Sequence, residues 1–116
     1  MTFAKAELSG STDGRPIAVA ATTSPGTTIH TAGAVTGDNN YDELHLDAAN
    51  IDTVDHVLTL EWGGTSASDQ IVFKVPAQST VTVADGLVLQ NALLVKAFAD
   101  TASKINLAGF ANKIRA

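Results

Sequence analysis

Hydrophobic and polar residues alternate along much of the chain, and this alternation predicts β-strands rather than helices. The clearest example is the stretch 41–49, in which apolar and charged side chains occupy alternate positions. Such a stretch is typical of an antiparallel strand with one buried and one solvent-facing side. Its apolar side comprises Leu44, Leu46 and Ala48, and its polar side comprises Glu43, His45 and Asp47.

Residues 56–76 predict a β-hairpin that contains the only tryptophan of the chain, Trp62. Gly63 and Gly64 follow this residue and let the backbone bend sharply. Pro76 has no amide hydrogen to donate and ends the second strand. We expect Glu61 and Asp69 to point outward, and the core-facing side chains to be Leu58, Leu60, Trp62, Ile71, Phe73 and Val75.

Turn-forming residues divide the remaining sequence into further short strands at 17–23, 27–32, 80–84 and 105–109. Residues 87–99 are apolar all round, which fits either a buried helix of about 12 residues or two strands broken at Gln90 and Asn91. The neighbouring strands favour the second interpretation. The sequence therefore predicts an all-β fold, an antiparallel β-sandwich or jelly roll of about seven to eight short strands.

A chain of 116 residues has the length of one domain. Residues 1–16 end in a run of turn formers and predict an N-terminal arm or edge segment. Residues 17–112 form the single β-sandwich domain, and residues 113–116 read as a basic C-terminal tail. The N-terminus lacks the layout of a signal peptide, and no apolar run is long enough for a membrane helix, so we expect no membrane partner. The chain contains no cysteine.

The charge of the chain is acidic overall and unevenly distributed. The net charge is −5 and the isoelectric point about 4.8, which argues against a nucleic-acid partner. Residues 38–69 carry a net charge of −8, whereas residues 70–116 carry +3. Surfaces of opposite sign suit contact between copies of one chain, although an acidic face can also serve solubility alone. The candidate interface residues are Glu43, His45, Asp47, Glu61, Lys96, Lys113 and Arg115.

The polar residues give little support for catalysis or metal binding. Carboxylates and an imidazole on one strand face, as at Glu43, His45 and Asp47, can bind a divalent metal, but no second histidine lies at a partner spacing. The stretch 38–43 resembles the start of a calcium loop, yet it lacks the required glycine and has Ala49 where the bidentate glutamate should be. A weaker calcium site of another type stays open. No nucleophile elbow or phosphate loop is present, so we expect no catalytic residues, no metal and no cofactor.

Several short apolar and glycine-containing motifs resemble those of small virion structural proteins of tailed bacteriophages. The resemblance covers about residues 41–112 and implies a small β-rich component of the phage head or neck, without active-site residues. The motifs that carry it are Leu58–Thr65, Asp69–Ile71, Val75–Ser79, Gly86–Asn91 and Val95–Ala99.

The first hypothesis is therefore a non-enzymatic virion protein that decorates and stabilises the capsid surface. Its expected partners are copies of itself in a symmetric oligomer, such as a trimer, and the major capsid protein or other virion proteins. Its expected location is the virion, assembled in the host cytoplasm. The alternative is a receptor- or glycan-binding β-sandwich module of a head or tail fibre, for which Tyr41 is the one aromatic residue at a loop edge. A hydrolase or metal-dependent enzyme has the least support.

Overall fold

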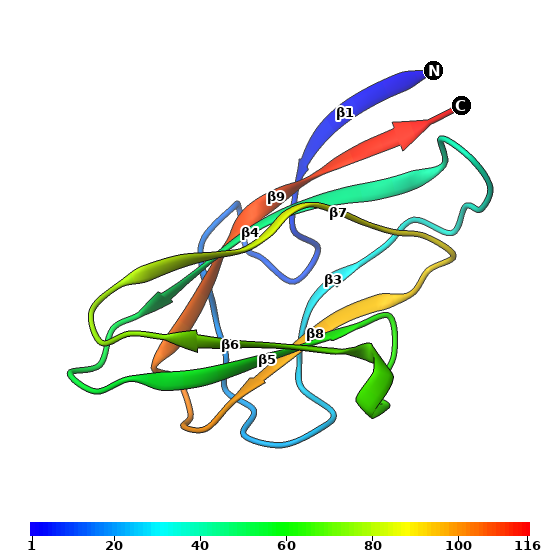
Figure 1. The fold of residues 1–116 in the computed structure, drawn as a ribbon. Coiled ribbons are helices and arrows are strands. Elements are labelled where there is room, and N and C mark those ends of the chain that lie inside the picture. The colour runs from blue at the N-terminus through cyan, green and yellow to red at the C-terminus, as the bar shows by residue number, and fades with distance from the viewer.

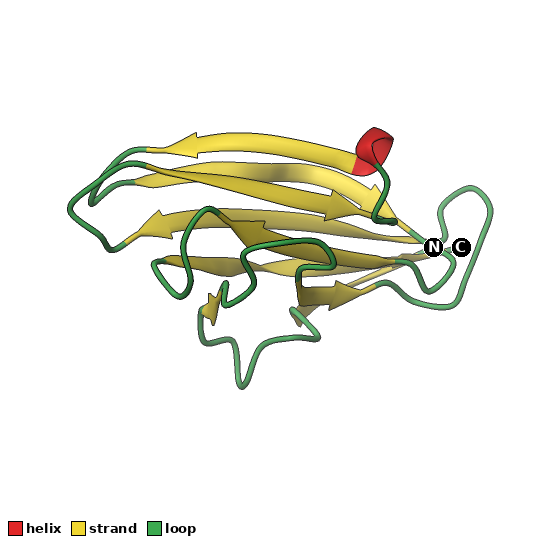
Figure 2. Cartoon of the chain, turned by 90° about the horizontal axis from the view of Figure 1, so that it is seen from below, coloured by secondary structure: helices red, strands yellow, loops and turns green.

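In the computed structural model, which describes residues 1–116, the chain forms two antiparallel sheets packed face to face (Figures 1 and 2). The predicted all-β sandwich is confirmed, with nine strands instead of seven to eight. The only other element is a short 3₁₀ turn, η1 (Ala67–Asp69). The strands are β1 (Thr2–Glu7), β2 (Ile17–Ala18), β3 (Thr27–Thr31), β4 (Tyr41–Asn50), β5 (His56–Trp62), β6 (Gln70–Val75), β7 (Thr80–Leu89), β8 (Leu94–Ala99) and β9 (Ile105–Arg115).

Sheet A has the strand order β1–β9–β4–β7, with the short β2 also paired to β9. Sheet B has the order β3–β8–β5–β6. The expected hairpin of residues 56–76 is present as the antiparallel pair β5–β6, although it lies at the edge of sheet B and not at its centre. The long strand β9 lies inside sheet A and pairs with β1, β2 and β4, so it organises that sheet.

The core lies between the two sheets and consists mostly of leucine, isoleucine, valine and alanine. Leu58, Leu60 and Val75 are fully buried in it. Ile71 and Phe73 are only partly buried, because β6 is an edge strand. Trp62 packs against the end of the core, and its indole N–H donates a hydrogen bond to the Val88 carbonyl at 3.1 Å.

Residues 87–99 form two strands, as the strand interpretation predicted. Strand β7 ends at Leu89 and β8 begins at Leu94. Between them, Asn91 and Ala92 adopt φ angles of 63° and 56°. These left-handed conformations cannot continue a right-handed helix, so the chain turns here and enters the opposite sheet.

Both chain ends are part of sheet A and lie next to each other (Figure 1). Residues 2–7 form the edge strand β1, and Leu8, which follows it, is buried. The prediction of a tail at residues 113–116 is wrong, because β9 continues to Arg115 and pairs with β1 on one side and β4 on the other. Ile114 is 8% exposed and pairs with Phe3 of β1 and Tyr41 of β4.

Candidate functional site

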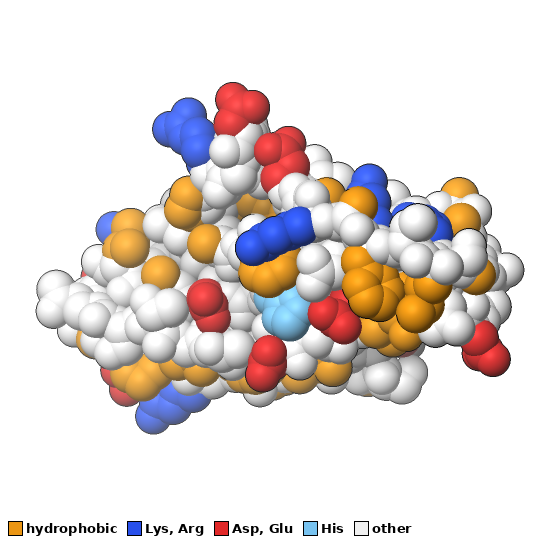
Figure 3. Space-filling view, turned by 90° about the horizontal axis from the view of Figure 1, so that it is seen from above, with side chains coloured by type: hydrophobic (Ala, Val, Ile, Leu, Met, Phe, Trp, Pro, Cys, Tyr) orange, Lys and Arg blue, Asp and Glu red, His pale blue; other side chains and the backbone are white.

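The outward side of β4 places Glu43, His45 and Asp47 together on the open face of sheet A, as their alternation predicted. Figure 3 views this face and shows acidic side chains around a histidine, with a cationic side chain close by and a group of hydrophobic side chains to one side. Neighbouring strands add Asp85 from β7 and Phe110 from β9. We call these five residues the acidic face.

His45 is the centre of the acidic face. Its Nε2 atom lies 2.8 Å from a Glu43 carboxylate oxygen, and its Nδ1 atom lies 3.5 Å from Asp85. The imidazole stacks on the Phe110 ring, with centroids 4.7 Å apart. Lys5 of β1 lies over the same ring, with Nζ 4.2 Å from its centroid. This arrangement fixes the imidazole in place and combines a cation with aromatic and acidic groups.

Hydrogen bonds also stabilise the ionised form of the Glu43 carboxyl group. The hydrogen bond to His45 and a second one from the Asn112 amide hold the pKa of the Glu43 carboxyl below its usual value, and they outweigh a small opposing effect of burial. Asp47 accepts a hydrogen bond from the Thr82 hydroxyl at 2.9 Å. The carboxylates of Glu43 and Asp47 are therefore oriented acceptors.

A shallow hollow of about 330 Å³ opens in the acidic face between His45, Asp47 and Phe110. Its floor depends on Gly109, because a Cβ atom at that position would overlap the His45 carbonyl oxygen. Strands β4 and β9 can therefore approach closely at this point. The chemistry of the hollow suits a basic or hydrogen-bond-donating side chain of another protein, since its rim carries carboxylates and its wall an aromatic ring.

Glu61 does not belong to this surface, because it lies on sheet B. The side chain points to the outer side of sheet B, but the loop around Ser24 folds over it, and the residue is 1% exposed. One carboxylate oxygen accepts the Ser24 hydroxyl at 2.5 Å, and the other accepts the Gly26 amide at 2.6 Å. Lys96 lies opposite Glu61 on β8, also in sheet B. Glu61 and Lys96 are thus separated from the acidic face by the core.

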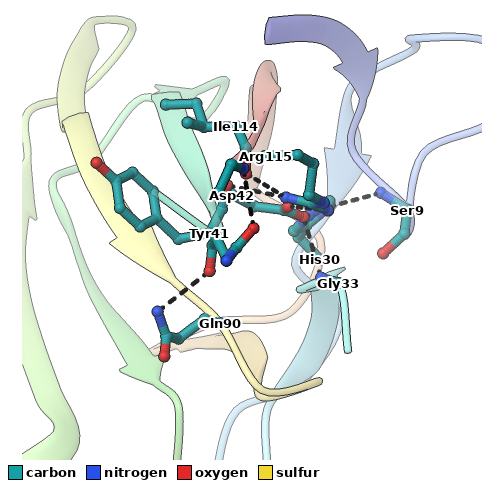
Figure 4. A network of polar contacts seen from close by, with 10 residues as sticks. Ser9, His30, Gly33, Tyr41, Asp42, Gln90, Ile114 and Arg115 are labelled. Atoms are coloured by element: carbon teal, nitrogen blue, oxygen red, sulfur yellow. Dashed lines mark hydrogen bonds and ion pairs between the residues drawn. The ribbon is translucent and has the colours of Figure 1, made fainter. Parts of the chain in front are cut away.

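Arg115, another predicted interface residue, is bound within its own chain. Its Nη2 group donates to Asp42 at 3.0 Å, and its Nη1 group donates to the carbonyl oxygens of Tyr41 and Ile114 (Figure 4). Lys113 differs from Arg115, because it remains exposed. Of the predicted interface residues, Glu43, His45 and Asp47 therefore lie together, whereas Glu61, Lys96, Lys113 and Arg115 lie apart from them.

Asp42 is a buried charged residue that the sequence analysis missed. Its side chain is fully enclosed and also accepts hydrogen bonds from His30 Nε2 at 2.8 Å and from the Gly33 amide at 3.3 Å (Figure 4). His30 accepts the Ser9 amide on Nδ1, so the proton that it shares with Asp42 is on Nε2. Burial alone would raise the pKa of Asp42, but the hydrogen bonds from His30 and Arg115 and the positive charge of Arg115 outweigh it and hold the pKa below its usual value.

A second missed group ties two loops to the start of β5. His56 Nε2 lies 2.8 Å from Asp52, and His56 Nδ1 lies 2.8 Å from Asp100. The hydrogen bond to Asp52 is the main reason that the pKa of His56 is raised, and Asp100 adds to it. Two carboxylates at the two ring nitrogens favour the imidazolium form, in which both nitrogens donate. Every buried side-chain polar atom of the protein has a hydrogen-bond partner.

No three histidine, aspartate or glutamate side chains lie close enough to hold a metal ion together. No helix has the length and apolar character needed to span a membrane. Comparisons with protein-family models, with curated proteins and with solved structures found no match. The candidate site is thus the acidic face, defined by its geometry and charge.

Proposed function

We propose that the protein is a non-enzymatic structural protein of a tailed-bacteriophage virion, and that it decorates and stabilises the capsid surface. The observation that carries this proposal is the acidic face, a sheet surface of oriented carboxylates around the His45–Phe110 stack. The phage assignment itself rests on the motif resemblance in residues 41–112.

The acidic face supplies features that a lattice-binding protein needs. The Asp85 side chain is 87% exposed and the Glu43 side chain 31% exposed, so both can reach a partner. Their carboxylates complement lysine and arginine side chains on the major capsid protein or another virion protein. The hollow next to them accepts a protruding side chain and defines its position. The sandwich below supports this face, and each of its buried side-chain polar atoms has a hydrogen-bond partner.

The proposal is tested by adding purified protein to capsids that lack it. We expect the wild-type protein to cosediment with the capsids and to raise the temperature at which they release DNA. The charge-reversed double variant Glu43→Lys/Asp47→Lys should lose cosedimentation. The matched control is Asp13→Lys/Asp38→Lys, which changes the net charge equally at two exposed positions outside the acidic face and should bind normally.

Two results would contradict this function. Wild-type protein that neither cosediments nor changes capsid stability removes the decoration role. Capsid stability that does not change, combined with loss of phage adsorption to cells, would favour the receptor- or glycan-binding alternative. The ring faces of Phe110 do not favour sugar stacking, because Lys5 lies over the ring and His45 stacks on it.

A further inference from the structure

The sandwich has four principal open edges, and three of them are protected against pairing with another strand. An edge strand exposes unpaired N–H and C=O groups, which natural proteins usually cover or interrupt. The open edges are β1 and β7 in sheet A and β3 and β6 in sheet B, while β2 is only two residues long.

Strands β3 and β7 are protected by irregular pairing and by local hydrogen bonds. The register between β3 and β8 shifts between Thr28 and His30, and the register between β4 and β7 shifts twice. The Ile29 carbonyl accepts the Gly10 amide, and the Thr31 amide donates to the Ser9 hydroxyl. On β7, the Val88 carbonyl accepts the Trp62 indole. These groups are unavailable to an added strand.

Strand β6 is regular, but it carries the exposed Lys74 near its end and is followed directly by Pro76. A lysine and a proline are common means of blocking edge pairing. Strand β6 also packs Val75 fully into the core, with Ile71 and Phe73 partly buried. It is therefore stabilised within its own chain.

Strand β1 lacks a proline and a core-facing side chain, and its one lysine, Lys5, lies over the Phe110 ring of its own chain. It pairs with β9 without any register shift from Thr2 to Glu7, contains no proline, and has no buried residue. Phe3 is 69% exposed, although it is the largest side chain of the strand. A regular edge strand that has one pairing partner and exposes a phenylalanine is a surface for a second strand.

We propose that β1 pairs antiparallel with β1 of a second copy around a two-fold axis at Ala4, so that sheet A continues through a symmetric dimer. Side chains that face each other across such a pair must share a side of the sheet, so odd-numbered residues oppose odd-numbered ones. An axis at Ala4 opposes Thr2 to Ala6 and Phe3 to Lys5, so it pairs residues 2–6 of the strand. This inference deepens the expectation from the sequence that copies of the chain associate, and it is independent of capsid binding.

Registers with the axis at Lys5 or Ala6 fit β1 less well. An axis at Lys5 would place the two Lys5 side chains opposite each other, where like charges repel. An axis at Ala6 would require the strand to continue past Glu7, but the next residue, Leu8, turns into the core. In the Ala4 register, Lys5 lies between Phe110 of its own chain and Phe3 of the other copy, because its ammonium group is already over Phe110.

The register gives a direct cross-linking test, because the chain contains no cysteine. In the variant Ala4→Cys the two introduced thiols face each other across the axis, at a separation that a disulfide can span. We expect mild oxidation to convert most of this variant to a covalent dimer. Thr2→Cys and Ala6→Cys should cross-link poorly alone and efficiently when mixed, because these residues oppose each other. Val72 lies on β6 and is 59% exposed, so cross-linking of Val72→Cys measures the background from random collisions.

Sedimentation of the protein without cysteine gives an independent measurement. We expect a concentration-dependent dimer, and we expect Phe3→Lys to weaken it roughly tenfold or more by placing two cations opposite each other. A monomer at all concentrations, or cross-linking of Ala4→Cys no greater than that of Val72→Cys, overturns the proposal. A trimer without the Ala4 cross-link also overturns it. Since these measurements use purified protein, their failure leaves capsid binding to be judged by its own experiment.

Discussion

Replacement of Asp42 by alanine should destabilise the protein strongly, although Asp42 lies outside the apolar core. The wild-type carboxylate is fully buried and accepts hydrogen bonds from His30, Gly33 and Arg115. Asp42→Ala removes all three acceptor contacts at once. It leaves the buried His30 donor and the half-buried Gly33 amide unsatisfied and a guanidinium group without its counter-charge, and each of these changes favours the unfolded chain.

The expected loss of stability in Asp42→Ala follows from how deeply each hydrogen-bond partner of Asp42 is buried. Removal of one member of a buried ion pair costs about 3–5 kcal/mol. Because the Arg115 side chain is 28% exposed and can turn to water, we expect the lower end, about 3 kcal/mol, for Asp42→Ala. That would lower the melting temperature by about 10–15 °C for a domain of this size. Arg115→Met should cost less, about 1–2 kcal/mol, because His30 and Gly33 still satisfy the carboxylate.

Urea unfolding, monitored by the fluorescence of Trp62, measures these differences in the free energy of unfolding, since Trp62 is the only tryptophan. Asp42→Asn keeps the size of the side chain and tests the charge. Because the folded-state pKa of Asp42 lies below its ordinary value of 3.8, the ionised carboxylate stabilises the fold at higher pH, and this stabilisation is lost as the pH falls through the folded-state pKa. The difference between wild type and Asp42→Asn should therefore shrink in acid. A cost of less than about 1 kcal/mol for Asp42→Ala at neutral pH would refute this reasoning.

The other two predictions concern His56 and Glu61. The pKa of His56 is raised above 6.5 by Asp52 and Asp100, so its stabilisation is complete below that value and lost as the pH rises through the folded-state pKa. Wild-type unfolding midpoints in urea should therefore fall more than those of His56→Gln between about pH 6 and about pH 9, and parallel curves would contradict the prediction. Glu61→Ala should lower the free energy of unfolding by about 2–4 kcal/mol, whereas Glu61→Gln, which keeps one acceptor, should cost about half as much. Equal effects of the two Glu61 variants would show that the hydrogen bonds to its carboxylate do not matter.

The sequence predicted those features of the fold that depend on local pattern. The alternation in residues 41–49 assigned β4 and the acidic side of its surface correctly, because one side of that strand meets the core and the other meets water. The break at Gln90 and Asn91 was equally visible, since turn residues interrupt an apolar run there. By contrast, the extension of β9 to Arg115 depends on partner strands that are distant in sequence.

The buried charges had a signal in the sequence that was not used. Asp42 is in phase with Leu44 and therefore faces the core side of β4, and His56 is in phase with Leu58 on β5. A charged residue in phase with buried leucines predicts a paired polar group, because an unpaired one would be too unfavourable. The identity of the partners was not predictable, because Arg115 is 73 residues away from Asp42. Glu61 had no such signal, since only the fold of the loop at Ser24 covers it.

The contacts of Asp42 with His30 and Arg115 also explain how β1, which has no buried residue, keeps its place in sheet A. Both ends of β1 are connected to Asp42: Ser9, just beyond one end, donates to His30, and Arg115 is paired with Thr2 at the other end. His30 and Arg115 in turn both bind the Asp42 carboxylate. A single enclosed carboxylate thus fixes the edge of sheet A, and the open side of β1 is left free for contact. The Asp42 carboxylate consequently both stabilises β1 within its own chain and holds the strand in the position in which it can pair with a second copy.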